Sequence, residues 1–159
     1  MGREVDMIFE ITGEPKSLAR PRLWKDKVYD SQAAEKRIDR LKLLEQRKTL
    51  DQQERALLDS GCDVVVTLLF YHATPRSFNR SQVNAIEQGL TRDVKGQSLL
   101  PHKKDIDNEI KYVFDVGNGL LWDDDRQITE VHAVKLYTNN APRTIIIIES
   151  INAQMLSNA

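Results

Sequence analysis

An acidic stretch at residues 103–130 constrains this chain more than any other feature. Asp105 and Asp107 stand two apart where a helix is expected to begin. Lys111 and Asp115 follow Asp107 at intervals of four residues, a spacing that places all three on one helix face. The sequence therefore predicts a helix with a row of charged side chains along one side.

Three consecutive aspartates, Asp123, Asp124 and Asp125, come shortly after this helix. Gly117 and Gly119 are expected to end the helix, as glycine commonly does past a helix C-terminus. The chain could then fold back and bring the two acidic groups together. Carboxylates that converge on one point repel each other unless a cation lies between them. Hard oxygen ligands of this kind suit Mg²⁺, for which Mn²⁺ can substitute.

Such a site would suit the hydrolysis of a phosphodiester, which needs an activated water, neutralised phosphate charge and a stabilised leaving oxygen. The best candidates for metal ligands are Asp105, Asp107 and Asp125, and Lys111 is placed to contact the scissile phosphate or to stabilise developing charge. Asp105 or Asp107 could instead cap the helix, and a D-x-D motif alone is weak evidence. A calcium-binding EF-hand is excluded because Ile110 stands where its glycine belongs.

The overall composition fits one soluble globular domain of 159 residues. No apolar run approaches the length of a membrane span. The N-terminus leads directly into a strand pattern, so no signal peptide is expected. The single cysteine, Cys62, excludes an intrachain disulfide and fits a reducing compartment. We expect it to be a buried thiol rather than a nucleophile.

The net charge of -1 conceals a segregation of charge along the chain. From Glu14 to Lys48 there are eleven Lys/Arg residues against six Asp/Glu, whereas from Asp105 to Glu130 there are eight Asp/Glu against two Lys/Arg. Basic segments around an acidic centre would suit a metal-dependent enzyme that acts on a polyanion. Solvated helix faces would give the same pattern, so segregation alone does not decide between these interpretations.

The pattern of apolar residues predicts a single α+β domain in which helices pack on a mixed β-sheet. Strands are expected at 5–12, 63–71, 127–137 and 143–151, the last two as an antiparallel hairpin. Helices are expected at 32–48, 80–88 and after residue 105, with a further helix, separate or continuous with the first, ending near Leu58. The tail at 152–159 is expected to fray. One apolar stripe of the first helix consists of Ala34, Ile38, Leu41 and Leu44.

A basic segment at residues 16–31 interleaves Trp24 and Tyr29 with Lys25 and Lys27. Cationic side chains beside aromatic rings form a usable surface for phosphates and splayed bases. A short basic hairpin with two core aromatics would look the same in the sequence. The candidate DNA-binding residues are Lys16, Arg20, Arg22, Lys25, Lys103 and Lys104.

The ordered combination of these motifs resembles the RusA family of Holliday junction resolvases, common in bacteriophages and prophages. The family's D-x-D-N-x-x-K run matches residues 105–111, and its D-D-x-Q-I/V run matches residues 124–128. Asp115 and Gly117 match the aspartate and the glycine-containing turn between the two runs. The resemblance extends over nearly the whole chain through the segments Gly13-Glu14-Pro15, Arg20-Pro21-Arg22, Val28-Tyr29 and Pro75-Arg76-Ser77-Phe78.

This resemblance implies a homodimeric, Mg²⁺-dependent endonuclease that nicks two opposed strands of a four-way DNA junction during recombination and repair. It implies that Asp105, Asp107 and Asp125 bind the metal, that Lys111 is the catalytic lysine, and that Asp124 and Asp115 support them. A two-fold dimer suits a junction with two symmetric strands to cut. The resemblance also implies a phage or prophage origin and the cytoplasm of a bacterial host.

Three departures from the family pattern bear on the site and the dimer. Lys104 stands where many members have proline, and Glu109 occupies a usually apolar position, so that it either faces solvent or joins the acidic cluster. Residues 42–60 suggest an added helical segment. The alternative functions are a broader nuclease for branched or flap DNA, a non-catalytic DNA-binding module and a toxin-like RNase. A pure DNA binder gains nothing from carboxylates that repel phosphates.

Overall fold

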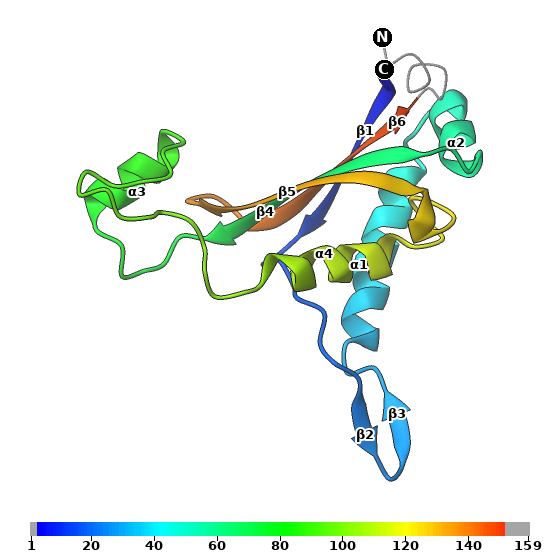
Figure 1. Cartoon of the computed structure of the whole chain (residues 1–159), viewed down its shortest axis with the longest axis horizontal. Coiled ribbons are helices and arrows are strands. Elements are labelled where there is room, and N and C mark those ends of the chain that lie inside the picture. The colour runs from blue at the N-terminus through cyan, green and yellow to red at the C-terminus, as the bar shows by residue number, and fades with distance from the viewer. Residues whose placement is uncertain (1–2, 152–159) are drawn as a thin grey trace.

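The computed structural model describes the backbone of residues 3–151 and the side chains of residues 7–151. The predicted frayed tail at 152–159 lies outside the described residues. In the described part of the chain no helix is long and apolar enough to cross a membrane. Four helices and a mixed sheet of four strands form the body of the molecule, which confirms the predicted α+β class (Figure 1).

The sheet has the strand order β1-β6-β4-β5. Strands β1 and β6 pair antiparallel, β6 and β4 pair antiparallel, and β4 and β5 pair parallel. Strand β4, which overlaps the strand expected at 63–71, takes an inner position between β6 and β5. The strands are β1 (Arg3–Thr12), β4 (Val64–Ala73), β5 (Ile128–Thr138) and β6 (Arg143–Ile151).

The predicted antiparallel hairpin of the last two strands is wrong, because β4 lies between them. Leu68 of β4 pairs with Ala133 of β5 on one side and with Ile146 of β6 on the other. Five of the seven residues at 64–70 are buried and the other two are half-buried, so an inner position in the sheet suits this run better than an edge. A short turn between two strands therefore did not make them neighbours here.

One face of the sheet is covered by α1 (Ala33–Arg47) and α4 (Ile106–Gly117) (Figure 1). Alternate side chains of the strands point into this layer, since successive residues of a strand face opposite sides. On β1, Met7 and Phe9 are buried whereas Ile8, between them, is 64% exposed. The core between sheet and helices includes Met7, Phe9, Leu68, Phe70, Tyr112, Val113, Val116, Ile146 and Ile148.

The apolar stripe predicted for α1 lies at the surface. Ile38, Leu41 and Leu44 are all exposed, and the helix instead buries Leu43 and the charged Asp39. Apolar spacing finds the helix but does not identify which face packs on the sheet. A stripe left open in this way is a candidate contact surface for another molecule.

Residues 42–60 contain the end of α1 and a separate helix, α2 (Gln52–Asp59). Asp51 and Glu54 form a capping box at the start of α2, which explains why the helix begins afresh there. Farther along the chain, α3 (Arg80–Glu87) confirms the short helix expected at 80–88. Cys62 is only half-buried, and its thiol lies 3.6 Å from the carbonyl oxygen of Leu57.

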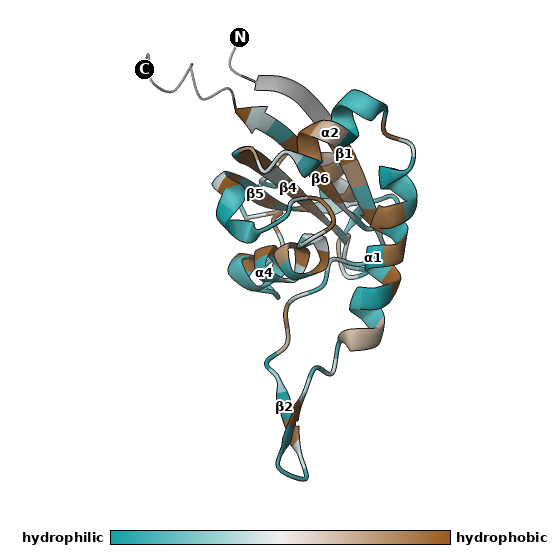
Figure 2. Cartoon of the chain, turned by 90° about the vertical axis from the view of Figure 1, so that its right-hand side faces the viewer, coloured by the Kyte–Doolittle hydropathy of each residue, from teal (hydrophilic) through white to brown (hydrophobic). Residues whose placement is uncertain are grey.

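The basic segment forms a two-stranded hairpin of β2 (Arg22–Trp24) and β3 (Lys27–Tyr29) that projects from the body (Figures 1 and 2). Every residue of both strands is exposed. The hairpin alternative considered for this segment is therefore right, but the expectation that its aromatics belong to a core is wrong. Trp24 and Tyr29 are 65% and 45% exposed.

Candidate active site on helix α4

Helix α4 presents its charged row to solvent, as the spacing predicted. Tyr112, Val113 and Val116 pack into the core, whereas Asp107, Lys111 and Asp115 are exposed. The apolar and charged residues alternate with the helical period, so burial of one face fixes the other face outward. The arrangement leaves the candidate catalytic residues accessible to a large substrate.

The two aspartates at the start of α4 keep their carboxylates available. Asp105 occupies the N-cap position with extended backbone but makes no side-chain capping hydrogen bond. Asp107 lies in the first turn, and its Oδ2 is 3.7 Å from Nζ of Lys111. Negative side chains are favoured beside the N-terminus of a helix. The helix thus tolerates both carboxylates without using Asp105 as a hydrogen-bonding cap.

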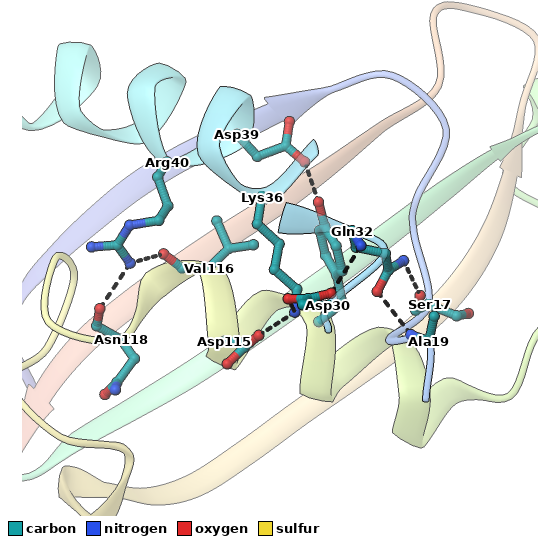
Figure 3. A network of polar contacts seen from close by, with 11 residues as sticks. Ser17, Ala19, Asp30, Gln32, Lys36, Asp39, Arg40, Asp115, Val116 and Asn118 are labelled. Carbon is teal, nitrogen blue, oxygen red and sulfur yellow. Dashed lines mark hydrogen bonds and ion pairs between the residues drawn. The ribbon is translucent and has the colours of Figure 1, made fainter. Parts of the chain in front are cut away.

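Asp115 is held by α1 rather than by its neighbours on α4. Nζ of Lys36 lies 2.6 Å from Oδ2 of Asp115 and 2.6 Å from Oδ2 of Asp30 (Figure 3). Burial alone would lower the pKa of Lys36, but hydrogen bonds to these two carboxylates outweigh it and raise the pKa. Hydrogen bonds from Lys36 and from the backbone of Gln32 lower the pKa of Asp30. Asp115 therefore links α4 to α1.

The C-terminal end of α4 is also fixed by α1. Nη1 of Arg40 donates to the carbonyl oxygens of Val116 at 2.7 Å and Asn118 at 2.9 Å (Figure 3). A cation is favourable at this end of a helix, where carbonyl groups lack partners. Several basic residues of α1 are thus engaged within the molecule, so the charge of the segment 14–48 is not all available to a polyanion.

A second polar cluster joins the loop after β1 to both helices. Oδ2 of Asp39, a fully buried residue, accepts from Nζ of Lys16 and from the hydroxyl of Tyr112, both at 2.7 Å. Burial and this hydrogen bond raise the pKa of Tyr112. The ammonium of Lys16 also lies 5.8 Å from the centre of the Tyr112 ring. Lys16, predicted to bind DNA, is thus engaged with a buried carboxylate.

Glu109 neither faces solvent nor joins the acidic cluster, the two possibilities considered from the sequence. It is fully buried, and its Oε1 lies 2.8 Å from Nε2 of His72 on β4. The contact lacks hydrogen-bond geometry. Nδ1 of His72 lies 3.5 Å from Oε1 of Glu14, which also accepts from the backbone N–H of Ala73. The first turns of α4 are thereby joined to the end of β4, a pairing that no sequence spacing signals.

The second acidic group forms a short 3-10 helix, η1 (Asp125–Gln127). Asp124 caps it in a capping box with Gln127 and pairs with Arg126, and hydrogen bonds from Arg126 lower the pKa of Asp124. Oδ1 of Asp125 accepts from Nε1 of Trp122 at 2.8 Å. These contacts give both aspartates local partners.

The chain does not bring Asp125 into one group with Asp105 and Asp107. The Trp122 ring packs edge-to-face on Phe114, in the last turns of α4, whereas Asp105 stands at the other end of this 12-residue helix. A helix of that length spans about 18 Å. Among residues 7–151 no group of three or more metal-binding side chains is assembled. The role of Asp125 as a metal ligand stays a prediction.

The donor chemistry at the start of α4 nevertheless fits Mg²⁺. This ion is commonly held by one or two carboxylates, with waters and substrate phosphates completing its shell. Asp105 and Asp107 supply two exposed carboxylates near each other in the chain. The described residues thus present two exposed carboxylates at the start of α4, and the metal site expected from the sequence stays a prediction.

The other predicted DNA-binding residues differ in how they are held. Arg20 and Arg22 are exposed at the hairpin, and Lys103 is exposed just before α4. Lys25 lies over the ring of Trp24, 5.5 Å from its centre. Lys104 is half-buried and donates to the carbonyl oxygen of Pro15 at 2.5 Å.

Comparison with known proteins assigns the chain to a family. No curated protein matches it. The family model described as Endodeoxyribonuclease RusA matches residues 12–149, which cover most of the chain and include α4, η1 and the hairpin. The chain therefore belongs to the RusA family of endodeoxyribonucleases.

Proposed function

We propose that this protein is a metal-dependent endonuclease that resolves four-way DNA junctions by paired nicks. The observation that carries the proposal is the D-x-D-N-x-x-K run of the RusA family at the solvent-exposed start of α4. There Asp105 and Asp107 keep accessible carboxylates, and Lys111 lies one helical turn beyond. Recombination or repair in the cytoplasm of a bacterial host, from a phage or prophage gene, is the proposed setting.

Asp105 and Asp107 would hold Mg²⁺, or Mn²⁺ in its place, when a DNA phosphate approaches α4. The bound ion would supply an activated water and neutralise phosphate charge. Asp125 is included as a third metal ligand because it belongs to the family motif, not because of where it lies in the structure. Asp124 is included as a residue that supports Asp125. Asp115 would act only by positioning α4, through its bond to Lys36.

Lys111 would contact the scissile phosphate. Its side chain is 60% exposed, and its ammonium is held loosely, 3.7 Å from Asp107. An exposed pair of this kind is worth little in stability, so the ammonium can exchange its carboxylate partner for a phosphate oxygen. In that position it would stabilise the charge that develops during hydrolysis.

Two copies of the chain would act together, and the exposed stripe of α1 supports a dimer. Leu41 and Leu44 line a groove of about 410 Å³ together with Leu120 and the stems of Arg37 and Arg40. Because α1 packs beside α4, joining two copies through α1 would bring two α4 helices into one two-fold dimer. That arrangement suits two symmetric strands of a junction.

The dimer surface is tested by Leu41→Glu, with Ile8→Glu as the matched control. Both side chains are more than half exposed, but Ile8 points away from the face of the sheet that α1 and α4 cover. Sedimentation should show a dimer for the wild type and for Ile8→Glu, and a monomer for Leu41→Glu. A monomer only with Ile8→Glu would place the interface on the sheet instead.

The catalytic proposal is tested by Asp107→Asn, with Asp123→Asn as the control. Both residues are exposed aspartates, and Asp123 has no proposed catalytic role. We expect Asp107→Asn to reduce junction cleavage in Mg²⁺ by at least about 100-fold, with junction binding kept or tightened because a negative charge near DNA is lost. Lost binding together with a lower Tm would make Asp107 a structural residue.

A non-catalytic DNA-binding module is the alternative from a different class. It predicts tight junction binding without cleavage in either Mg²⁺ or Mn²⁺. The two exposed, like-charged carboxylates at the start of α4 count against it, because they would repel a phosphate in the absence of a cation. A nuclease for flap or other branched DNA would instead cleave those substrates as fast as a four-way junction.

A further inference from the structure

The projecting hairpin of β2 and β3 has two chemically different faces. In its register Arg22 pairs with Tyr29, Leu23 with Val28, and Trp24 with Lys27. Paired residues lie on the same side of a two-stranded ribbon, and successive residues lie on opposite sides. One face therefore carries two aromatic and two cationic side chains, and the other carries Leu23 and Val28.

The turn of the hairpin adds a further cation to this set. Lys25 and Asp26 both have positive φ, 49° and 62°, the pattern of a tight two-residue turn. Nζ of Lys25 lies over the Trp24 ring. From Arg20 to Tyr29 there are four basic residues and one acidic residue, Asp26. Since the basic residues Arg20, Arg22 and Lys27 have no acidic partner within the described chain, the hairpin tip is a cationic surface.

The base of the hairpin is fastened to the helix that carries the candidate catalytic residues. The Gln32 side chain accepts from the N–H of Ala19 and donates to the carbonyl oxygen of Ser17, both at 2.8 Å (Figure 3). The N–H of Leu18 donates to the carbonyl oxygen of Asn108, next to Asp107, at 2.9 Å. These bonds fix the point from which the hairpin projects relative to the start of α4.

We infer that the aromatic-basic face of this hairpin stacks on unpaired or splayed bases at the branch point of the DNA. Exposed aromatic rings bind bases of any sequence through their π-faces, and neighbouring cations hold the phosphates. Paired bases in a linear duplex are already stacked on each other, so the rings find free partners only where pairing is interrupted. The hairpin would thus distinguish branched from linear DNA, while α4 performs the cleavage of the proposed function.

The inference is tested by binding without divalent metal, so that no cleavage occurs. The substrates are a four-way junction with 2-aminopurine at the branch point and a linear duplex of the same sequence. We compare the wild type with Trp24→Ala/Tyr29→Ala and with the control Leu23→Ala/Val28→Ala, which removes exposed side chains from the opposite face. Since no residue of either strand is buried, both variants should keep the wild-type Tm.

Binding of the wild type should change the emission of 2-aminopurine at the branch point. Removal of the two rings should abolish that change and weaken junction binding by about tenfold or more for each ring. Binding of the linear duplex should stay within about twofold of the wild type. The Leu23→Ala/Val28→Ala variant should match the wild type in junction affinity, duplex affinity and 2-aminopurine emission. Equal losses on junction and duplex, or no loss, would overturn the inference. Dissociation of the dimer by Trp24→Ala/Tyr29→Ala would overturn it too, since the hairpin would then contact the second copy.

The inference depends on the proposed function for its substrate, but the two can fail separately. Junction cleavage in Mg²⁺ that is unaffected by loss of both rings would refute the inference alone. Ring-dependent binding of branched DNA without any cleavage in Mg²⁺ or Mn²⁺ would refute the catalytic proposal and leave the hairpin's role intact.

Discussion

The buried pair of Glu109 and His72 gives a quantitative test of how α4 is held. His72→Leu would leave the fully buried carboxylate of Glu109 without its imidazole neighbour at 2.8 Å. Leaving a buried polar group without its partner costs about 1–3 kcal/mol, and more when the group is charged. Glu109→Leu should cost less, about 1–2 kcal/mol, because His72 keeps Glu14 as a neighbour.

The double variant His72→Leu/Glu109→Leu should lie within about 1 kcal/mol of the wild type, because apolar residues of similar volume can replace a buried pair. Urea denaturation at pH 7 gives the four free energies of unfolding and hence the coupling energy, expected to be about 1 kcal/mol or more. Glu45 and Lys48, an exposed pair on α1, serve as the control cycle. Their coupling should stay below about 0.5 kcal/mol.

A coupling energy near zero for Glu109 and His72 would refute this reasoning, as would a His72→Leu cost below about 1 kcal/mol. Either result would mean that solvent or another group compensates the carboxylate. If the reasoning holds, the double variant keeps α4 in place and should retain junction cleavage, which separates the structural role of this pair from the chemistry.

Three further predictions concern the contacts around α4 and the hairpin. Gly117→Ala should lower the Tm and shift the fluorescence of Trp122, because a Cβ would lie 2.9 Å from that ring. The overpacking should cost about 1–3 kcal/mol, which offsets or outweighs the gain of about 1 kcal/mol in helix propensity from glycine to alanine. Lys36→Met should lower the free energy of unfolding at pH 8, because the charged ammonium is lost. Since the pKa of Lys36 in the folded protein is raised above 10.5, the difference in free energy of unfolding between variant and wild type should disappear only as the pH rises through that higher pKa. A difference that stays constant with pH would contradict this. Gln32→Ala should speed tryptic cleavage in the hairpin with little change in Tm, and unchanged cleavage would show that its two bonds do not hold the hairpin base.

Local patterns predicted the elements of the fold well. The run at 63–71 is strongly apolar and β-prone, and it became the buried inner strand β4. The charged row of α4 was also placed correctly, and so was Gly119, which follows the helix with positive φ, whereas Gly117 is still the last residue of the helix. The family motifs, which occupy fixed spacings, were found on the same basis.

Long-range partners could not be predicted from these patterns. The stripe of Ile38 and Leu41 has the period of a buried helix face, yet the face carrying Asp39 packs inward, where Lys16 and Tyr112 donate to Oδ2 of that carboxylate. Glu109 is buried for a similar reason, through a histidine 37 positions earlier in the chain. A polar residue that finds a distant partner overrides the apolar pattern, and one sequence contains no sign of that partner.

The order of the strands in the sheet and the position of Asp125 relative to Asp105 could not be predicted from local sequence patterns either. The turn at 139–142 suggested a hairpin, but parallel pairing of β4 with β5 separates the last two strands. The distance between Asp105 and Asp125 depends on how the chain returns after α4, and Trp122 fixes that return against Phe114. The Trp122 ring, which bonds to Asp125, thus fixes that aspartate beside the last turns of α4.

The central claim, that α4 cuts four-way junctions, is tested most directly by incubating the purified protein with a synthetic junction and with linear duplex of the same sequence, each with and without Mg²⁺. We expect paired, symmetric nicks in the junction alone and only when Mg²⁺ is present. Tight binding of the junction without nicks in Mg²⁺ or Mn²⁺, or equal cleavage of the linear duplex, would contradict it.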